Sequence, residues 1–141
     1  MILERIKMIP EFIKAWDSRK HELEAAFQEK HPDYIDIVKA VVGILDRTNE
    51  YRYPDVERIH EIDDGNYQGV LVYVIGSNGY QPDEYWYVKV AYGSCSGCDT
   101  LEGIMSDYES NPDGTPSSEQ IKDYMTLALH IIQNIKKMDD Y

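Results

Sequence analysis

The two cysteines of this chain, Cys95 and Cys98, are the residues whose type and spacing best suit chemistry. A serine and a glycine separate them, and another glycine and serine precede them. Small residues let the backbone turn tightly, so both sulfur atoms can reach one point. Such convergence suits a metal ion or a reversible disulfide better than it suits core packing.

A zinc ion is the first ligand that this spacing suggests, because two thiolates supply half of a tetrahedral site. We expect Asp64-Gly65 to form a two-residue hairpin turn, which places His60 opposite Gly69. Antiparallel pairing then brings Cys95 close to this turn, where carboxylates can complete the site. Zinc is the only cofactor predicted. The predicted ligands are Cys95, Cys98, Asp99 and Asp64, with Asp63 as a further candidate.

Two other interpretations of the cysteine pair remain open. A thiol just before a helix N-terminus has a stabilised thiolate, so the pair could be the centre of a thiol redox or zinc-dependent enzyme. Against this, no βαβ unit surrounds the pair, and Asp99 beside Cys98 disfavours a thiolate by like-charge repulsion. Cysteines are also common as small buried hydrophobic residues, in which case the segment is only a tight turn.

Other catalytic patterns are not found in the sequence. There is no nucleophile with a neighbouring base, no phosphate-binding glycine loop after a strand, and no paired-histidine zinc motif. We therefore predict that the chain is not an enzyme.

The net charge of −12, from 26 acidic and 14 basic residues, limits the partners that the chain can bind. A surface of this sign repels phosphates, so direct binding to nucleic acid is not expected. No apolar run approaches the roughly 20 residues that span a bilayer, and the N-terminus lacks the pattern of a signal peptide. We expect a cytoplasmic protein without membrane association, whose cysteines stay reduced unless a metal engages them.

Residues 78–121 combine acidic and aromatic side chains. They hold eight acidic residues and a single basic one, Lys89, together with several tyrosines. Phenol faces accept cations and carboxylates pair with them, so this composition suits docking onto a groove lined by Arg and Lys. A solvated acidic loop beside a half-buried strand is the alternative, and the tyrosine face could also be a homodimer interface. The residues predicted to contact a basic partner are Tyr85, Tyr87, Asp107, Glu109 and Asp113.

The order of apolar periodicities predicts an α+β fold in a single domain, residues 1–141. Its centre is expected to be a three-stranded antiparallel meander, flanked by N-terminal helices and a long C-terminal helix. Lys136-Lys137 suits the dipole at the end of that last helix. Helices are expected at 10–30, 33–45, 99–108 and 117–135, and strands at 56–62, 67–75 and 84–92.

The string from Tyr92 to Leu101 reads YGSCSGCDTL and follows an aromatic strand. It resembles a segment that recurs in small proteins encoded by phages and prophages. The resemblance implies a phage accessory protein that binds and blocks a host protein, as anti-CRISPR inhibitors do, and it assigns no role to any residue. A replication or packaging adaptor is a further interpretation that the residues do not separate from this one.

The function predicted on this basis is that of an acidic viral binding protein in the host cytoplasm. It would inhibit a host defence protein, such as a Cas nuclease, by occluding a basic surface. The cysteine loop would then be a structural, zinc-binding staple.

Overall fold

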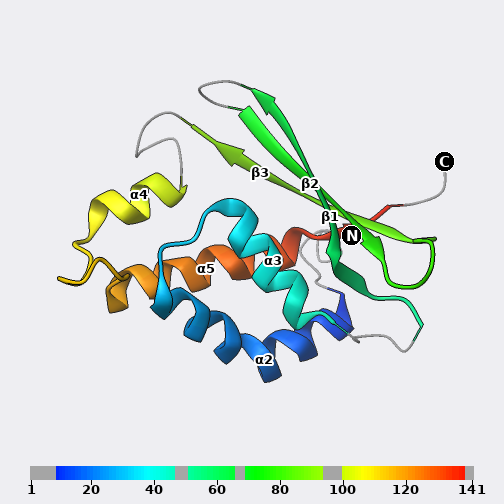
Figure 1. Cartoon of the computed structure of the whole chain (residues 1–141), viewed down its shortest axis with the longest axis horizontal. Helices are drawn as coiled ribbons and strands as arrows, with labels where there is room; N and C mark the ends of the chain where they lie inside the picture. Colours follow the sequence, from blue (N-terminus) through cyan, green and yellow to red (C-terminus); the bar gives the residue numbers. More distant parts are fainter. Residues whose placement is uncertain (1–8, 47–50, 66–68, 94–99, 139–141) are drawn as a thin grey trace, which may run out of the picture.

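The computed structural model describes residues 9–46, 51–65, 69–93 and 100–138, apart from the side chain of Asp64. Within these residues, four helices accompany one four-stranded antiparallel sheet, so the α+β class is confirmed (Figure 1). The elements are α2 (Pro10–Glu29), α3 (Tyr34–Ile44), β1 (Pro54–Gly65), β2 (Gly69–Ser77), β3 (Tyr85–Tyr92), α4 (Thr100–Asp107), α5 (Ser118–Asn134) and β4 (Lys136–Lys137).

Local signals in the sequence explain where three helices begin. Pro10 is the first residue of α2, where a missing N–H costs nothing. Before α3, the Asp36 carboxylate accepts a hydrogen bond from the backbone N–H of Asp33 at 3.0 Å. Before α5, Gln120 Oε1 accepts from Ser117 N at 2.9 Å, and Ser117 Oγ accepts from Gln120 N at 3.4 Å. This reciprocal capping box confirms the predicted start of the last helix.

The prediction of a three-stranded sheet is wrong by one short strand. Helix α5 ends at Asn134, and the next residue, Ile135, is buried with an extended backbone. The chain then runs antiparallel to β3, where Lys136 and Lys137 form β4. These lysines therefore continue the sheet and are not part of a helix end. A strand of two residues is too short to leave a period-two pattern, so only the tertiary contact reveals it.

The hairpin between β1 and β2 turns later than predicted. Asp64 and Gly65 still belong to β1, where Gly65 pairs with Gly69, and the connecting residues 66–68 lie outside the described residues. His60 consequently lies opposite Val74. The predicted and observed registers differ by an odd number of residues, and such a shift exchanges the two faces of a strand.

Burial shows which face of β1 the helices cover. In the observed register Ile59 lies opposite Ile75 and packs against the core, whereas Ile62 is 45% exposed on the other face. An Asp-Gly pair expresses a local turn preference, but the helices decide which side chains of a strand are buried. The Asp-Gly pair therefore predicted a turn at two residues that belong to strand β1.

Helices α3 and α5 pack against one face of the sheet (Figure 1). Burial alternates along β3, and the outward Tyr85 is 41% exposed, as the predicted period of two requires. Helix α3 is buried on most of its circumference, as its two apolar stripes indicate. The buried strand residues facing the helices are Leu71, Tyr73, Ile75, Trp86, Val88 and Val90.

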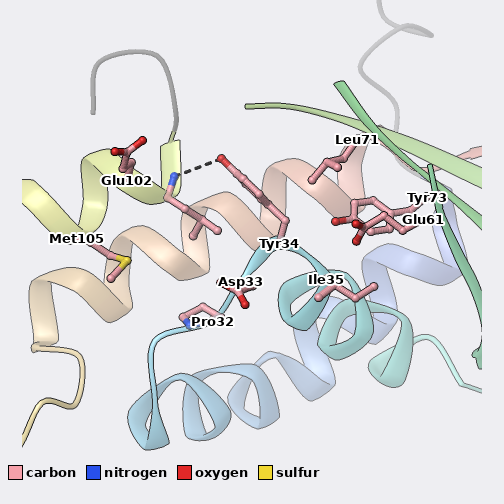
Figure 2. A pocket seen from close by; sticks show the side chains of 10 residues that line it. Pro32, Asp33, Tyr34, Ile35, Glu61, Leu71, Tyr73, Glu102 and Met105 are labelled. Carbon is pink, nitrogen blue, oxygen red and sulfur yellow. Dashed lines mark hydrogen bonds between the residues drawn. The ribbon is translucent and has the colours of Figure 1, made fainter. Parts of the chain in front are cut away.

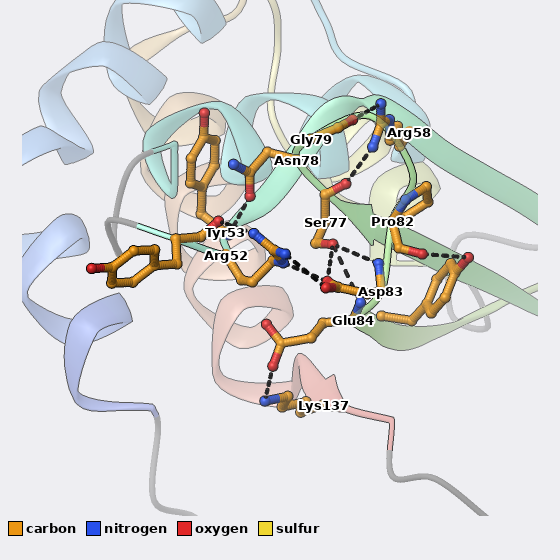
Figure 3. A network of polar contacts seen from close by, with 12 residues as sticks. Arg52, Tyr53, Arg58, Ser77, Asn78, Gly79, Pro82, Asp83, Glu84 and Lys137 are labelled. Atoms are coloured by element: carbon orange, nitrogen blue, oxygen red, sulfur yellow. Dashed lines mark hydrogen bonds and ion pairs between the residues drawn. The ribbon is translucent and has the colours of Figure 1, made fainter.

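A polar network closes the end of the sheet away from the hairpin (Figure 3). The buried Ser77 hydroxyl accepts hydrogen bonds from the backbone N–H groups of Asp83 at 3.2 Å and Glu84 at 3.3 Å. Arg52 contacts both oxygens of the Asp83 carboxylate, at 2.5 and 2.7 Å, and this holds the pKa of Asp83 below its usual value. Lys137 of β4 lies 2.5 Å from the Glu84 carboxylate. These contacts join the loop after β2 to the flanking strands.

Candidate functional site

The predicted zinc ligands fall outside the part of the chain that the structure describes. Cys95, Cys98 and Asp99 belong to residues 94–99, and the side chain of Asp64 is not described either. The zinc site and its two alternatives therefore stay predictions. Among the residues that are described, no three histidine, cysteine or carboxylate side chains group together as a metal site needs.

The flanking residues show where the cysteine segment is attached. Tyr92 ends β3 opposite Gly69, so the segment leaves the sheet at its hairpin end. The Tyr92 hydroxyl reaches over this glycine, which has no side chain, and donates to the Asp63 carboxylate at 2.5 Å. On the other side, Thr100 begins α4. The predicted strand before the segment and the predicted helix after it are both confirmed.

The structure places the residues predicted to bind a partner at two separate ends of the sheet. Tyr85 and Tyr87 lie at the start of β3, close to β4. Asp107 is the last residue of α4 and Glu109 follows it, and α4 comes after the opposite end of β3 (Figure 1). The tyrosines and the carboxylates therefore do not form one continuous surface.

The carboxylates define an acidic end of the molecule, built by α4, residues 108–117 and the first turn of α5. No lysine or arginine occurs between Lys89 and Lys122. The side chains of this acidic end are exposed, so their charges are not neutralised by burial in the core. The acidic end comprises Glu102, Asp107, Glu109, Asp113 and Glu119.

One member of the acidic end also has a structural role. The Asp113 carboxylate accepts hydrogen bonds from Thr115, 3.0 Å from its backbone N and 2.6 Å from its Oγ1. These bonds lower the pKa of Asp113 below its usual value. Replacement of Asp113 would therefore disturb the loop as well as its charge.

Buried residues hold this loop against the helices. His31 Nδ1 lies 2.6 Å from the Tyr124 hydroxyl, and its Nε2 lies 2.8 Å from Ser110 Oγ. Tyr124 is fully buried, and this burial raises its pKa to about 12. The side chain of Gln120, also fully buried, donates from Nε2 to the Tyr108 carbonyl at 3.0 Å. The acidic end is thus positioned by the core.

A pocket of about 410 Å³ lies between α4 and the sheet, and its walls come from the start of α3, from β1 and β2, and from the start of α4 (Figure 2). Among the described residues, its lining holds three carboxylates, Asp33, Glu61 and Glu102, and no lysine, arginine or histidine. A larger hollow of about 510 Å³ between α2 and α5 has Lys20 and Lys122 on its rim and so is mixed in charge. The smaller pocket is the one that continues the acidic end.

Tyr73 projects into the pocket from β2. Its side chain is fully buried, and its hydroxyl makes no well-formed hydrogen bond among the described residues, although the Glu61 carboxylate lies close enough to accept one. Glu61 lies directly opposite it on β1, and Figure 2 shows both side chains reaching from the sheet toward Tyr34. Burial, followed by the nearby Glu61 carboxylate, raises the pKa of Tyr73 well above its usual value. The Tyr34 hydroxyl itself accepts a hydrogen bond from the backbone N–H of Leu101 at 3.3 Å.

Sequence reasoning missed this pocket. Glu61 and Tyr73 become neighbours only through the observed register, which the predicted turn would not have produced. One signal was present: Glu61 shares a strand face with Ile59, although its own side chain is exposed.

Comparison with known protein families, with curated proteins and with solved structures found no match for the chain. No described helix combines the length and the apolar character that crossing a bilayer requires. The function is therefore argued from the acidic end and the pocket beside it.

Proposed function

We propose that this chain is an acidic binding protein that docks its acidic end onto a basic surface of a protein partner. The observation that carries the proposal is the run of exposed carboxylates on α4 and residues 108–117, in a stretch without lysine or arginine between Lys89 and Lys122. Charges of one sign on a preformed surface raise the rate of association with an oppositely charged partner. The contacts of His31 and Gln120 to the loop support a surface that is ordered before binding.

A nucleic-acid-binding protein is the kind of partner that fits best. Its channel is lined by Arg and Lys for phosphates, and carboxylates can occupy the same positions. In the form that the phage resemblance implies, the partner is a host defence protein such as a Cas nuclease, and this chain inhibits it in the host cytoplasm by occlusion. Such inhibition needs no catalytic step, so the chain is proposed to be a non-enzymatic inhibitor.

The cysteine loop and the tyrosines have separate roles in this proposal. The cysteine loop is proposed to bind zinc and so to act as a structural cross-link. Tyr85 and Tyr87 lie at the other end of the sheet, beside β4, where they are proposed to form a second, separate contact or a homodimer interface.

The test measures binding to purified Cas nucleases, binding to an Arg- and Lys-rich peptide, and inhibition of DNA cleavage, at low and high salt. The double variant Asp107→Lys/Glu109→Lys should bind at least about tenfold more weakly at low salt, because both substitutions replace attraction by repulsion. High salt should weaken the wild-type complex, because it screens exposed charges.

A matched control carries the same change in net charge on another element. Asp17 and Glu24 are exposed on α2, so Asp17→Lys/Glu24→Lys should bind like the wild type. Glu22 is not used, because it pairs with Arg19 at 2.8 Å. Equal loss in both double variants, or no binding to nuclease or peptide at low salt, would contradict the proposal.

A further inference from the structure

We propose that the pocket between α4 and the sheet binds an alkylguanidinium group, with the Glu61 carboxylate and the Tyr73 hydroxyl as its polar contacts. The most direct source of this group is an arginine side chain of the basic partner, and in that respect the inference rests on the proposed function. A free small-molecule guanidine has the same chemistry and is the other source.

The charge of the lining selects a cation. Asp33, Glu61 and Glu102 supply three carboxylates, and the lining holds no basic residue in the part of the chain that the structure describes. The three carboxylates would repel an anion entering the pocket. A guanidinium presents a planar fork of N–H donors that matches a carboxylate with two hydrogen bonds, so it fits better than a neutral polar group.

The buried hydroxyl of Tyr73 points to a ligand independently of the charge. Buried polar groups in proteins nearly always have a hydrogen-bond partner, and one without a partner needs a reason. The Tyr73 hydroxyl is fully buried and lines the pocket beside the Glu61 carboxylate, which can only accept, and within the described residues no donor bonds to the phenol oxygen. A guanidinium N–H held by Glu61 can donate to the phenol oxygen, which would satisfy both groups at once.

The remaining walls suit the stem of an arginine side chain. Ile35, Leu71 and Met105 line the pocket beside the polar groups. Methylene groups of a long cationic side chain pack against such apolar surface while the charged head makes the polar contacts. A volume of about 410 Å³ is enough for one such side chain.

The binding test titrates the protein with N-acetyl-arginine-N-methylamide and follows backbone amide resonances by NMR. The matched neutral probe is the corresponding citrulline derivative, which has nearly the same shape but no charge. We expect the arginine probe, and not the citrulline probe, to shift the amides of Leu71, Tyr73 and Leu101. Equal responses to both probes, or no shifts at these residues, would overturn the proposal.

Isosteric variants test the two polar contacts. Glu61→Gln and Tyr73→Phe should each weaken binding of the arginine probe by about tenfold, because each removes one partner and keeps the shape of the side chain. Glu57→Gln is the control, since Glu57 is exposed on the same strand outside the pocket. A melting temperature close to that of the wild type shows that each variant is folded. Unchanged affinity in both pocket variants would rule out the assigned contacts.

Two further experiments complete the test. The first identifies the source of the ligand, and the second shows which of the two proposals fails. Agmatine, a free guanidine, is titrated beside the peptide-like probe, and the tighter of the two identifies the source. If Glu61→Gln leaves partner binding intact while Asp107→Lys/Glu109→Lys abolishes it, the proposed function stands and the arginine source is wrong. If the arginine probe binds but no basic partner does, the pocket stands and the proposed function fails.

Discussion

At the scale of single residues, two buried tyrosines carry out different tasks with the same functional group. Tyr73 and Tyr124 are both fully buried. The Tyr124 hydroxyl lies 2.6 Å from His31 Nδ1, whereas the Tyr73 hydroxyl makes no well-formed hydrogen bond within the described residues and lies beside the Glu61 carboxylate. A buried polar group without a partner loses its hydration and gains nothing in return. The two hydroxyls should therefore contribute to stability with opposite signs.

The same substitution at both positions tests this difference. Tyr124→Phe should lower the free energy of unfolding by about 1–2 kcal/mol, because it leaves the His31 ring nitrogen without its partner. Tyr73→Phe should leave it unchanged or raise it by up to about 1 kcal/mol, because it removes an uncompensated group. Urea unfolding followed by circular dichroism measures both values. A marked loss of stability in Tyr73→Phe would mean that its hydroxyl has a partner in the free protein.

Alkaline pH should destabilise the fold through the same tyrosines. Burial raises the pKa of Tyr124 to about 12, while an unfolded tyrosine titrates near pH 10. Between these values the unfolded chain binds fewer protons than the native one, so the free energy of unfolding falls as the pH rises. The limiting slope is about 1.4 kcal/mol per pH unit for each such tyrosine. Urea unfolding from about pH 9 to 12 should show this slope, and Tyr124→Phe should reduce it. An identical slope in the variant would show that other groups cause the loss.

The cysteine prediction is tested by an experiment at the same scale. If Cys95 and Cys98 hold zinc, the protein purified without chelator should contain about one zinc per chain. Cys95→Ser/Cys98→Ser should then lose the metal and part of the stability. Elemental analysis with a count of free thiols makes the measurement. Absence of metal together with equal, slow alkylation of both thiols would leave the tight-turn interpretation.

At the scale of elements, the loop after β2 depends on one serine. Ser77 is fully buried at the end of β2, and its hydroxyl accepts from two backbone N–H groups of the loop, those of Asp83 and Glu84. Because β4 reaches this loop through Lys137, the serine also supports the strand that the sequence did not predict. The arrangement makes the end of the sheet a cooperative unit.

Ser77→Ala should therefore lower the free energy of unfolding by about 1–2 kcal/mol, since two N–H groups lose their acceptor. Ser106→Ala is the control, because Ser106 is exposed on α4 and should change stability by no more than about 0.5 kcal/mol. Hydrogen exchange at residues 83–87 should accelerate in Ser77→Ala alone. Equal exchange in both variants would show that the ion pairs suffice to hold the loop.

At the scale of the whole molecule, the charge on which the proposed binding depends opposes folding. A net charge of −12 repels itself in the compact state. The acidic end concentrates this cost, and Asp107 adds to it because it ends α4, where the helix dipole disfavours a negative charge.

Neutralisation of the acidic end should stabilise the protein. Asp107→Asn/Glu109→Gln should raise the free energy of unfolding by about 0.5 kcal/mol at low salt, and screening at high salt should remove the difference. Asp17→Asn/Glu24→Gln makes the same change in net charge on α2, near Lys14 and Lys20, and should have a smaller effect. Thermal unfolding at several salt concentrations gives the comparison. A gain that persists at high salt would not be electrostatic.

What the sequence by itself determined are the features that arise from neighbours along the chain. Helix periodicity, the Ser117–Gln120 capping box and the alternation along β3 all depend on residues a few positions apart. The α+β class follows from their order, and the net charge follows from composition alone. Such local preferences can be recognised in the sequence without knowledge of the tertiary contacts.

The tertiary structure decided everything that depends on residues distant in the chain. The β1–β2 register, the short strand β4 and the separation of the tyrosines from the acidic end are outcomes of packing between elements. The pocket is the clearest case, because Glu61 and Tyr73 meet only after the sheet has formed against α3 and α5. Burial is a property of the assembled core, and no short window of sequence contains it.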